Sequence, residues 1–265
     1  MLNGRELPFA QLRSKRMQNK FLFLFSATLM LALFNMTAPA LALDGNEILR
    51  QVDRNMQPAS YEMYRKLINI ESDGTKKEFV LYTVKKGHSA MVALFLQPAS
   101  EKGRTTLRLD DNMWLYIPNV GKPIRITSLQ SVVGGVFNNS DILRLDYSAE
   151  YTAESIQDQG ETYLLDLKAK STSVAYDRLK MTVDKKNVLP LKIGCYAVSG
   201  MLIKNLHYSK IKDFGDGLNR PSMLETDSPM YKGYKSVMLF AKIKKKEVPD
   251  EVFTLNYMSK IDELR

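Results

Sequence analysis

Short apolar runs separated by turn signals fill the chain after residue 60. Turn signals such as Ser-Asp-Gly at 72–74 and Gln-Gly at 159–160 recur about every ten residues, a spacing typical of all-β sandwiches and barrels. Parallel strands would need long helical crossovers between them, and the pattern lacks these. The sequence therefore predicts an antiparallel meander of roughly ten to eleven strands, near 67–71 and at 79–84, 90–96, 105–109, 113–117, 163–169, 178–183, 191–196, 202–208, 237–243 and 253–258.

Several of these runs are apolar on both faces. Residues 90–96 read AMVALFL, so Met91 and Phe95 point to one face of the strand and Val92 to the other. A meander with one solvated face would alternate apolar and polar residues instead. About ten strands in one sheet also tend to curl and form a concave face. We therefore expect the second face to be covered by the N-terminal helix, by residues 127–144, by a partner chain or by an apolar ligand.

One helix is predicted before the strands. Asp44 or Asn46 serves as its N-cap, and Pro58 lies just beyond its end. Its apolar residues recur every three or four positions on one face, namely Ile48, Leu49, Val52 and Met56. We expect this face to pack on the sheet.

Residues 127–144 interrupt the strand pattern. Gly134 and Gly135 lie in a flexible apolar stretch, and Ser140 is a candidate N-cap for a short helix through Ile142. An apolar segment of this length inside a meander is either a lid or a packed loop. The two glycines do not form a phosphate cradle, because the lysine and the spacing of a P-loop are missing.

The N-terminal 42 residues have the features of a secretory signal peptide. A basic leader precedes an uncharged apolar run at 21–34, and Ala-Leu-Ala at 40–42 supplies a cleavage site. The run would span about 21 Å as a helix, less than the roughly 30 Å of a bilayer core. We therefore predict cleavage after Ala42; an uncleaved anchor is the alternative, and Met17 is an alternative start.

Composition and charge exclude several classes of function. The 265 residues are 45% hydrophobic and 25% charged, the balance of a globular protein. The formal net charge is +9, and removing the leader leaves about +5, too little to imply nucleic-acid binding. The one cysteine, Cys195, excludes an internal disulfide and a cysteine zinc site, and two histidines exclude a multi-histidine metal centre.

No catalytic set stands out in the sequence. His88 and His207 have no cysteine or histidine near them in sequence, so we interpret both as structural. Turn chemistry explains the placement of the aspartates that an acid–base pair would need, Asp110, Asp111, Asp141 and Asp146. We predict no catalytic residue, no cofactor and no metal site.

The densest positive run contains Lys242, Lys244 and Lys246. Alternation places these lysines on one face of a strand. The simpler interpretation is a solvated face that protects an edge strand. The functional alternative is docking to an acidic partner or to anionic lipid headgroups.

A series of local patterns follows in order along the chain. They are Gln-Pro-Ala-Ser-Glu-Lys-Gly at 97–103, Thr-Leu-Arg-Leu at 106–109, Trp-Leu-Tyr-Ile-Pro at 114–118, Lys-Pro-Ile-Arg-Ile at 122–126, Gly-Gly-Val-Phe at 134–137, Ser-Asp-Ile at 140–142, Tyr-Ser-Ala-Glu-Tyr at 147–151 and Val-Phe-Thr at 252–254. Together they resemble the LolA-like outer-membrane lipoprotein-sorting proteins, in the branch associated with RND-type exporters. The resemblance covers nearly all of residues 44–265. The tryptophan and glycine patterns are its most specific parts.

The resemblance implies a mainly β fold with a few helices. Its curved antiparallel sheet would form an incomplete β-barrel, with helices covering the concave face. Residues 1–42 would be the cleaved signal peptide and residues 43–265 a single LolA-like domain in the periplasm. Arg104, Arg108 and Arg125 are candidates for the cavity arginine that holds a lid shut in the best-known carriers.

The function implied by the resemblance is that of a periplasmic carrier or chaperone without catalysis. It would bind the acyl chains of lipoproteins or lipids, accept them from an inner-membrane transporter of the RND or ABC type, and pass them to an outer-membrane acceptor. The cargo is open: a lipoprotein, a free lipid or another apolar compound. The candidate cavity residues are Met91, Phe95, Trp114 and Tyr116, and the candidate lid residues are Val133, Phe137, Ile142 and Leu143.

Two other functions remain open at this point. The first is a sensor or adaptor subunit of an RND-type exporter, which would use the same fold to bind a membrane-protein partner. The second is an envelope hydrolase, which the lack of a recognisable nucleophile and base disfavours.

Overall fold

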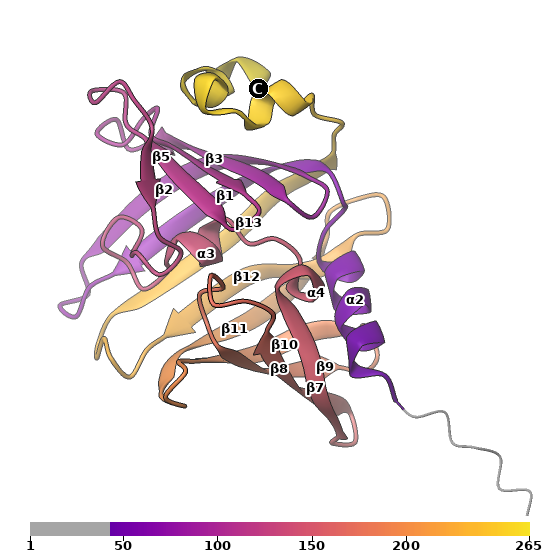
Figure 1. Ribbon diagram of the computed structural model, residues 1–265. Coiled ribbons are helices and arrows are strands. Elements are labelled where there is room, and N and C mark those ends of the chain that lie inside the picture. The colour runs from indigo at the N-terminus through magenta and orange to yellow at the C-terminus, as the bar shows by residue number, and fades with distance from the viewer. Residues whose placement is uncertain (1–42) are drawn as a thin grey trace, which may run out of the picture. The chain divides into compact units, whose positions relative to one another are not determined.

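Thirteen antiparallel strands form one curved sheet in the computed structural model, which describes residues 43–265 (Figure 1). The predicted signal peptide, residues 1–42, lies outside the described residues. The first six strands are β1 (Tyr61–Ile70), β2 (Lys76–Lys86), β3 (Ala90–Gln97), β4 (Thr105–Leu109), β5 (Asn112–Tyr116) and β6 (Ile124–Ile126). The other seven are β7 (Tyr151–Asp158), β8 (Thr162–Ala169), β9 (Arg178–Asp184), β10 (Leu189–Tyr196), β11 (Leu202–Asp213), β12 (Asn219–Asp227) and β13 (Lys235–Lys245).

The chain enters the sheet in its middle and forms two meanders, one on each side of the β1–β13 pair. The first meander runs from β1 to the edge strand β6, and the second runs from the opposite edge strand β7 back to β13, which pairs with β1. The two edge strands do not pair with each other, so the barrel stays open. The predicted fold, an incomplete antiparallel barrel with helices over its concave side, is confirmed.

Residues 127–150, which we call the crossover segment, connect the two edges. They contain two short helices, α3 (Asn139–Ile142) and α4 (Tyr147–Glu150). Figure 1 shows α3 inside the curve of the sheet and α4 beside the helix α2 (Gly45–Met56). Asp44, one of the two predicted candidates, caps α2 by accepting a hydrogen bond from the backbone amide of Asn46. The N-cap of α3 is Asn138 rather than Ser140, because Asn138 and Asp141 form a capping box.

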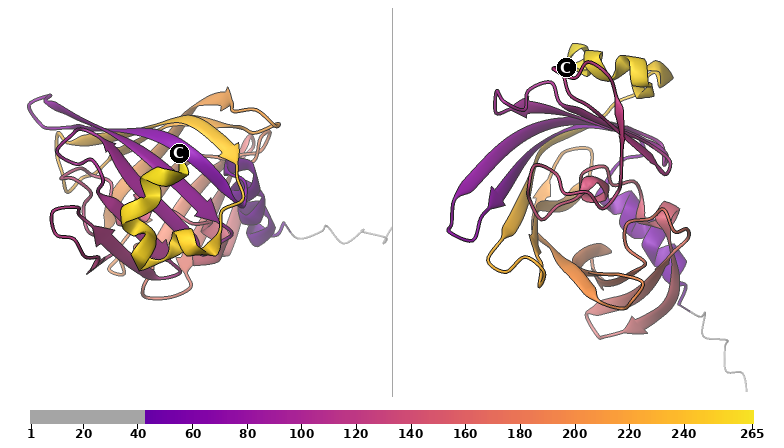
Figure 2. Two further views of the ribbon diagram at one scale, coloured as in Figure 1. Left: turned by 90° about the horizontal axis from the view of Figure 1, so that it is seen from above. Right: turned by 60° about the vertical axis from the view of Figure 1, so that its left-hand side comes forward.

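The concave face holds the larger hydrophobic core. Leu49 and Val52 of α2 and Phe137 and Leu143 of the crossover segment pack there against inward residues of the strands, such as Leu67. The right-hand view of Figure 2 shows these elements filling the hollow of the sheet. The crossover segment therefore occupies the space that a closed barrel would enclose.

A second core lies on the outer face of β3, β4 and β5. The C-terminal 3-10 helices η2 (Asp250–Phe253) and η3 (Leu255–Leu264) cover it, as the left-hand view of Figure 2 shows. The predicted strand at 253–258 is therefore wrong. Met258 and Ile261 lie three residues apart on one side of η3, and together with Phe253 they cover Val92 and Leu107 of the strands.

Three strands were missed by the apolar pattern. β6 has only three residues, β7 is a largely exposed edge strand, and β12 carries Pro221 among polar residues. β1 begins at Tyr61, earlier than the predicted start near residue 67, because charged residues alternate with its buried ones. Cross-strand pairing, rather than local hydrophobicity, determines these elements.

The sheet is weakly joined between β12 and β13. Only Met223–Thr226 of β12 pair with Ser236–Leu239 of β13, whereas β13 pairs with β1 along its whole length. Beyond Leu239 the two strands separate, so the second half of β13 has a partner on one side only among the described residues. No helix within residues 43–265 is long and apolar enough to cross a membrane.

Candidate functional site

Three carboxylates of the crossover segment are each paired with a buried cation of the sheet. Asp141 lies 2.8 Å from Lys204 of β11, and Asp146 lies 2.9 Å from Lys85 of β2. Glu150 lies 2.5 Å from Arg108 of β4. All six side chains are at least 93% buried. These pairs attach the segment to strands on both halves of the sheet.

Asp141 is the centre of the largest polar network. It also accepts hydrogen bonds from Arg144, from the Asn138 amide and from the hydroxyl of Tyr176. Burial alone would raise the pKa of Asp141, but the charges of Lys204 and Arg144 hold it below its usual value. Lys204 also donates to the carbonyl of Val136, so one buried lysine holds two parts of the crossover segment.

Asp146 lies at the end of the segment near α2. It accepts hydrogen bonds from Lys85 and Gln57, and its second oxygen contacts Nδ1 of the exposed His88. Burial raises and Lys85 lowers the pKa of Asp146, and the net effect is a lowered pKa. His88 therefore has a carboxylate partner that lies 58 residues away in sequence.

Asp53 of α2 holds α4 from the opposite side. Its carboxylate accepts hydrogen bonds from the backbone amides of Tyr147, at 2.7 Å, and Ser148, at 2.8 Å. These are free amides at the start of a helix, where a negative charge is favoured. Burial nevertheless raises the pKa of Asp53 to about 6.

The Gly134-Gly135 stretch touches the sheet directly. A Cβ on Gly135 would lie 2.1 Å from Oδ1 of Asn69 on β1, so a larger residue there would displace the Asn69 side chain. The neighbouring Val136 amide donates to the hydroxyl of Ser236 on β13. Val133 has a φ of +47°, an unusual conformation for a β-branched residue. The apolar tip is thus packed tightly on the sheet through a strained turn.

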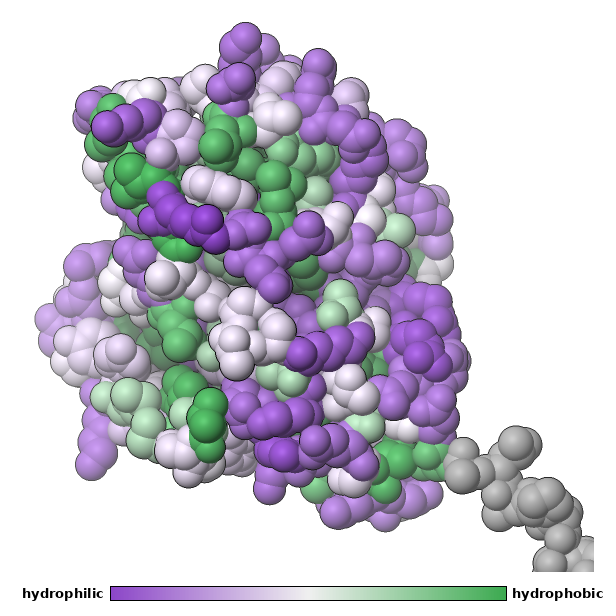
Figure 3. Space-filling view, in the orientation of Figure 1, coloured by the Kyte–Doolittle hydropathy of each residue, from purple (hydrophilic) through white to green (hydrophobic). Residues whose placement is uncertain are grey.

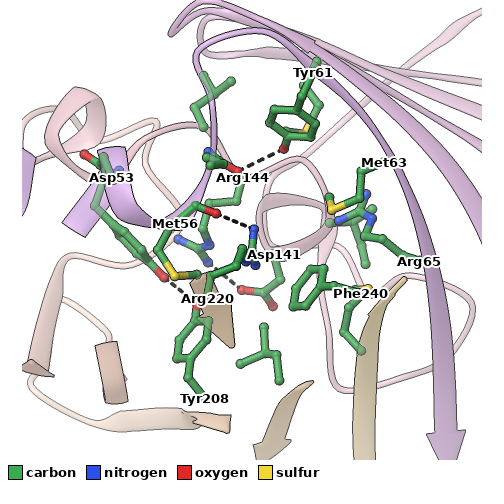
Figure 4. Close-up of a pocket in the computed structure, with 17 residues that line it drawn as sticks. Asp53, Met56, Tyr61, Met63, Arg65, Asp141, Arg144, Tyr208, Arg220 and Phe240 are labelled. Carbon is green, nitrogen blue, oxygen red and sulfur yellow. Dashed lines mark hydrogen bonds and ion pairs between the residues drawn. The ribbon is translucent and has the colours of Figure 1, made fainter. Parts of the chain in front are cut away.

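A small cavity lies where β12 and β13 separate. Its volume is about 50 Å³, enough for a few water molecules but far below the size of common ligand pockets. Side chains from α2, the crossover segment and five strands converge on it, and Figure 4 shows them. The lining combines charged residues with four methionines, Met56, Met63, Met91 and Met238. Methionine adapts readily to apolar ligands of different shape.

A larger cleft of about 570 Å³ adjoins this cavity. It is lined by Arg50, Arg54, His88 and Asp146, among others. Asp53 and Gln57 line both the cleft and the cavity, so they form the wall between them.

The structure separates the predicted cavity residues into two groups. Met91 lines the cavity and Phe95 is buried in the concave core. Trp114 and Tyr116 pack instead against the outer core beneath the C-terminal helices, so their predicted grouping with Met91 is wrong. The strand register explains this, because Met91 and Val92 lie beside Arg108 and Leu107, which pair in turn with Met113 and Trp114.

The predicted lid residues do come together. Phe137, Ile142 and Leu143 are buried in the concave core, and Val133 packs against it. Arg108 is the candidate arginine that reaches the crossover segment, because it donates to the carbonyl of Leu143 in addition to pairing with Glu150. Arg104 pairs with Glu101, and Arg125 is exposed on β6.

The predicted docking lysines differ in their environment. Lys242 and Lys244 are exposed on the half of β13 that lacks a neighbour on the β12 side among the described residues. Lys246 is not free, since it binds Glu62 and the carbonyl of Leu264 and so fixes the C-terminal helices.

The site offers binding groups more than reactive ones. Cys195 is buried, and burial raises its pKa to about 12. Within residues 43–265, no three histidine, cysteine or acidic side chains gather as a metal site would require. Sequence reasoning missed the inward cations Arg65, Lys85, Lys204 and Arg220. Their only sequence signal is a charged residue at an inward position of an alternating strand, as in Met63, Arg65 and Leu67.

The comparisons with known proteins identify the family and the fold. A family model described as "uncharacterized protein" matches residues 87–260. The chain belongs to this family. No curated protein sequence matches the chain.

Three solved structures share the fold. A LolA superfamily protein from Nitrosomonas europaea is 25% identical, with a TM-score of 0.74, and the match covers 82% of this chain and all of that one. A DUF1329 family protein from Desulfovibrio piger is 21% identical, with a TM-score of 0.70, covering 81% and 97% of the two chains. A putative outer membrane lipoprotein-sorting protein domain from Vibrio parahaemolyticus is 17% identical, with a TM-score of 0.68, covering 81% and 98%. The LolA-like resemblance inferred from the sequence is thereby confirmed.

The buried ion pairs predict a strong effect of neutralising one partner. Asp146→Asn leaves Lys85 buried without a charged partner, so we expect the free energy of unfolding to fall by about 3–5 kcal/mol. The exposed pair of Asp158 and Lys185 supplies the control, and Asp158→Asn should cost less than about 1 kcal/mol. Urea unfolding of both variants measures the difference. Equal losses would contradict the anchoring role of Asp146.

The raised pKa of Asp53 predicts a pH dependence with a definite sign. The folded state holds the proton of the Asp53 carboxyl group more tightly than the unfolded chain does. The resulting contribution to the free energy of unfolding is fully present below about pH 3.8 and is lost as the pH rises through about 6. The Asp53→Asn variant lacks this contribution. Its stability should therefore rise more steeply, or fall less, than that of the wild type between pH 4 and 7 in urea titrations. Parallel profiles would show that Asp53 does not titrate in this range.

Proposed function

We propose that this protein is a periplasmic carrier or chaperone for the acyl chains of lipoproteins or lipids. The observation that carries the proposal is the covering of the concave face by a segment of the chain rather than by barrel closure. Phe137, Ile142 and Leu143 occupy apolar space that a ligand chain would need. The names of the structural relatives, a LolA superfamily protein and a putative lipoprotein-sorting domain, support the same class of function.

The described conformation is the closed one. A cavity of about 50 Å³ cannot take an acyl chain, so loading requires the crossover segment to move away from the sheet. The face of the molecule in Figure 3 is consistent with this, because its apolar residues lie in several separate groups among polar ones. The ligand and the crossover segment would then compete for one surface.

An acyl chain on the concave face would replace contacts that the crossover segment loses. Each methylene moved from water to an apolar site contributes about 0.8 kcal/mol, so a long acyl chain contributes on the order of 10 kcal/mol. Opening loses the apolar contacts and the buried ion pairs of the crossover segment, whose side chains regain water in exchange. Loading and release are therefore an exchange that a competing acceptor can reverse.

The acyl-contact residues that we propose are those on the concave side. Met91 and Phe95 would line the opened cavity, and Val133, Phe137, Ile142 and Leu143 would move with the lid. The strained turn at Val133 supports a segment that has two positions, since strain is relieved when it leaves the sheet. Trp114 and Tyr116 are not part of this site.

The carrier needs a donor and an acceptor. We propose an inner-membrane transporter of the RND or ABC type as donor and an outer-membrane protein as acceptor. Lys242 and Lys244 are candidates for docking, because they are exposed on a half-paired strand. The same surface would serve an adaptor subunit that carries no lipid, which is the alternative function.

An engineered disulfide tests whether the lid must open. A Cβ at Gly135 lies within 2.5 Å of the Asn69 side chain, so Asn69→Cys with Gly135→Cys can join the crossover segment to β1. The native Cys195 is buried and does not interfere. We expect the oxidised double variant to bind neither a diacylated lipopeptide nor phosphatidylethanolamine in native mass spectrometry. The reduced double variant should bind at least one of these two lipids.

The reduced double variant and the single variant Asn69→Cys serve as controls. Binding by the oxidised double variant at the wild-type level would contradict the lid. A wild-type protein that binds none of these lipids, but co-purifies with a membrane protein, would favour the adaptor function instead.

A further inference from the structure

The buried charges on the concave side do not balance. The described residues place five well-buried cations there, Arg65, Lys85, Arg108, Lys204 and Arg220. Lys85, Arg108 and Lys204 are paired with the carboxylates of the crossover segment. Arg65 and Arg220 form no ion pair with any carboxylate of residues 43–265. Both line the cavity between β12 and β13.

Arg220 has a structural explanation. Its guanidinium donates to the carbonyl of Met56, the last residue of α2, at 2.6 Å. It also lies 4.4 Å from the centre of the Phe240 ring. A cation at the carboxyl end of a helix is favoured by the helix dipole and by its free carbonyls. Arg220 is therefore largely satisfied in the closed state.

Arg65 has no such explanation. Its side chain is 4% exposed and donates one hydrogen bond, to the hydroxyl of Thr83 at 2.8 Å. Its Nε is buried and has no hydrogen-bond partner in the part of the chain that the structure describes. The other charged groups around the cavity are engaged elsewhere: Asp141 by Lys204 and Arg144, and Asp53 by two backbone amides. A buried charge without a partner is costly, so its position needs a reason.

The geometry around Arg65 suggests what the partner is. Arg65 of β1 pairs in register with Phe240 of β13, and the ring of Phe240 contacts the guanidinium of Arg220. Met63 and Met238 lie beside them in the same cavity, as Figure 4 shows for Met63. A guanidinium presents planar donors that match a carboxylate or a phosphate. A ligand that satisfies this site has a negative head and an apolar remainder.

We infer that Arg65 binds the anionic head of an amphiphile whose chain lies on the concave face, and that Arg220 adds a second positive charge. This inference deepens the proposed function, on which it rests, by naming the ligand class: a fatty acid or a phosphate-bearing lipid rather than a neutral one. An uncharged diacylglycerol group would leave Arg65 as it is in the closed state, buried and unpartnered.

The test compares amphiphiles that differ only in the head. The wild-type protein is titrated with oleate, oleyl alcohol, lysophosphatidic acid, monoolein and inorganic phosphate, and binding is measured by isothermal titration calorimetry. We expect oleate and lysophosphatidic acid to bind about tenfold or more tightly than their neutral counterparts, because hydrogen bonds to a charged group are lost in the latter. Inorganic phosphate alone should not bind, because it lacks the chain.

Variants then assign the preference to Arg65. Arg65→Met should weaken binding of the two anionic ligands by about tenfold or more and leave monoolein and oleyl alcohol unchanged. Arg65→Lys should restore part of the preference. Arg125→Met, which removes an exposed arginine of β6, should change the binding of neither the anionic nor the neutral ligands. Arg65→Met is also expected to raise the melting temperature, because it removes an unpaired buried charge, so a loss of preference cannot be ascribed to unfolding.

The outcomes separate this inference from the proposed function. Equal binding of anionic and neutral amphiphiles, or an equal loss of both in Arg65→Met, would overturn the role of Arg65 and leave the carrier intact. Binding of inorganic phosphate as tightly as lysophosphatidic acid would show a plain ion site and also overturn it. A wild-type protein that binds no amphiphile of either kind would overturn the carrier itself, and the ligand class with it.

Discussion

The crossing of the chain from one edge of the sheet to the other is the constraint on which the structure depends. Because the first meander ends at β6 and the second begins at β7, residues 127–150 must pass over the concave face. Buried polar groups of this segment need partners. The carboxylates of Asp141, Asp146 and Glu150 pair with buried cations of β11, β2 and β4. The same crossing fills the hollow that an open barrel leaves. The covering and its polar attachment are thus two consequences of one topology.

This attachment has a functional consequence. A lid held by apolar contacts alone would have no fixed position, whereas ion pairs and the close approach of Gly135 to Asn69 define one. The ion-paired side chains of the lid can also bind water when the lid leaves the sheet. Opening therefore does not leave all of them without hydrogen-bond partners. The cavity lies where the pairing of β12 with β13 ends, and Nε of Arg65 has no partner there among the described residues. A place for an anionic head beside an apolar face follows from that arrangement.

Much of the architecture could be predicted from local patterns. The alternation in residues 90–96 correctly separated Met91 and Phe95 from Val92, and Asp44 was correctly placed as a helix cap. The register between strands was not predictable, because nothing local says that Trp114 pairs with Leu107 on the outer face. The inward cations were not predictable either, since a lysine such as Lys85 in a strand normally indicates a solvated position. Only the tertiary structure brings Lys85 to Asp146, 61 residues away.

Hydrogen exchange of the crossover segment, with and without lipid, tests whether a ligand displaces this segment from the sheet. In the free protein, the amides of Gly135, Val136 and Leu143 are hydrogen-bonded within the closed lid or to the sheet and should be protected. We expect saturating oleate or lipopeptide to speed exchange in residues 131–143 and to leave η3 unchanged. Faster exchange confined to η3, or lipid binding that leaves the crossover segment as protected as before, would contradict it.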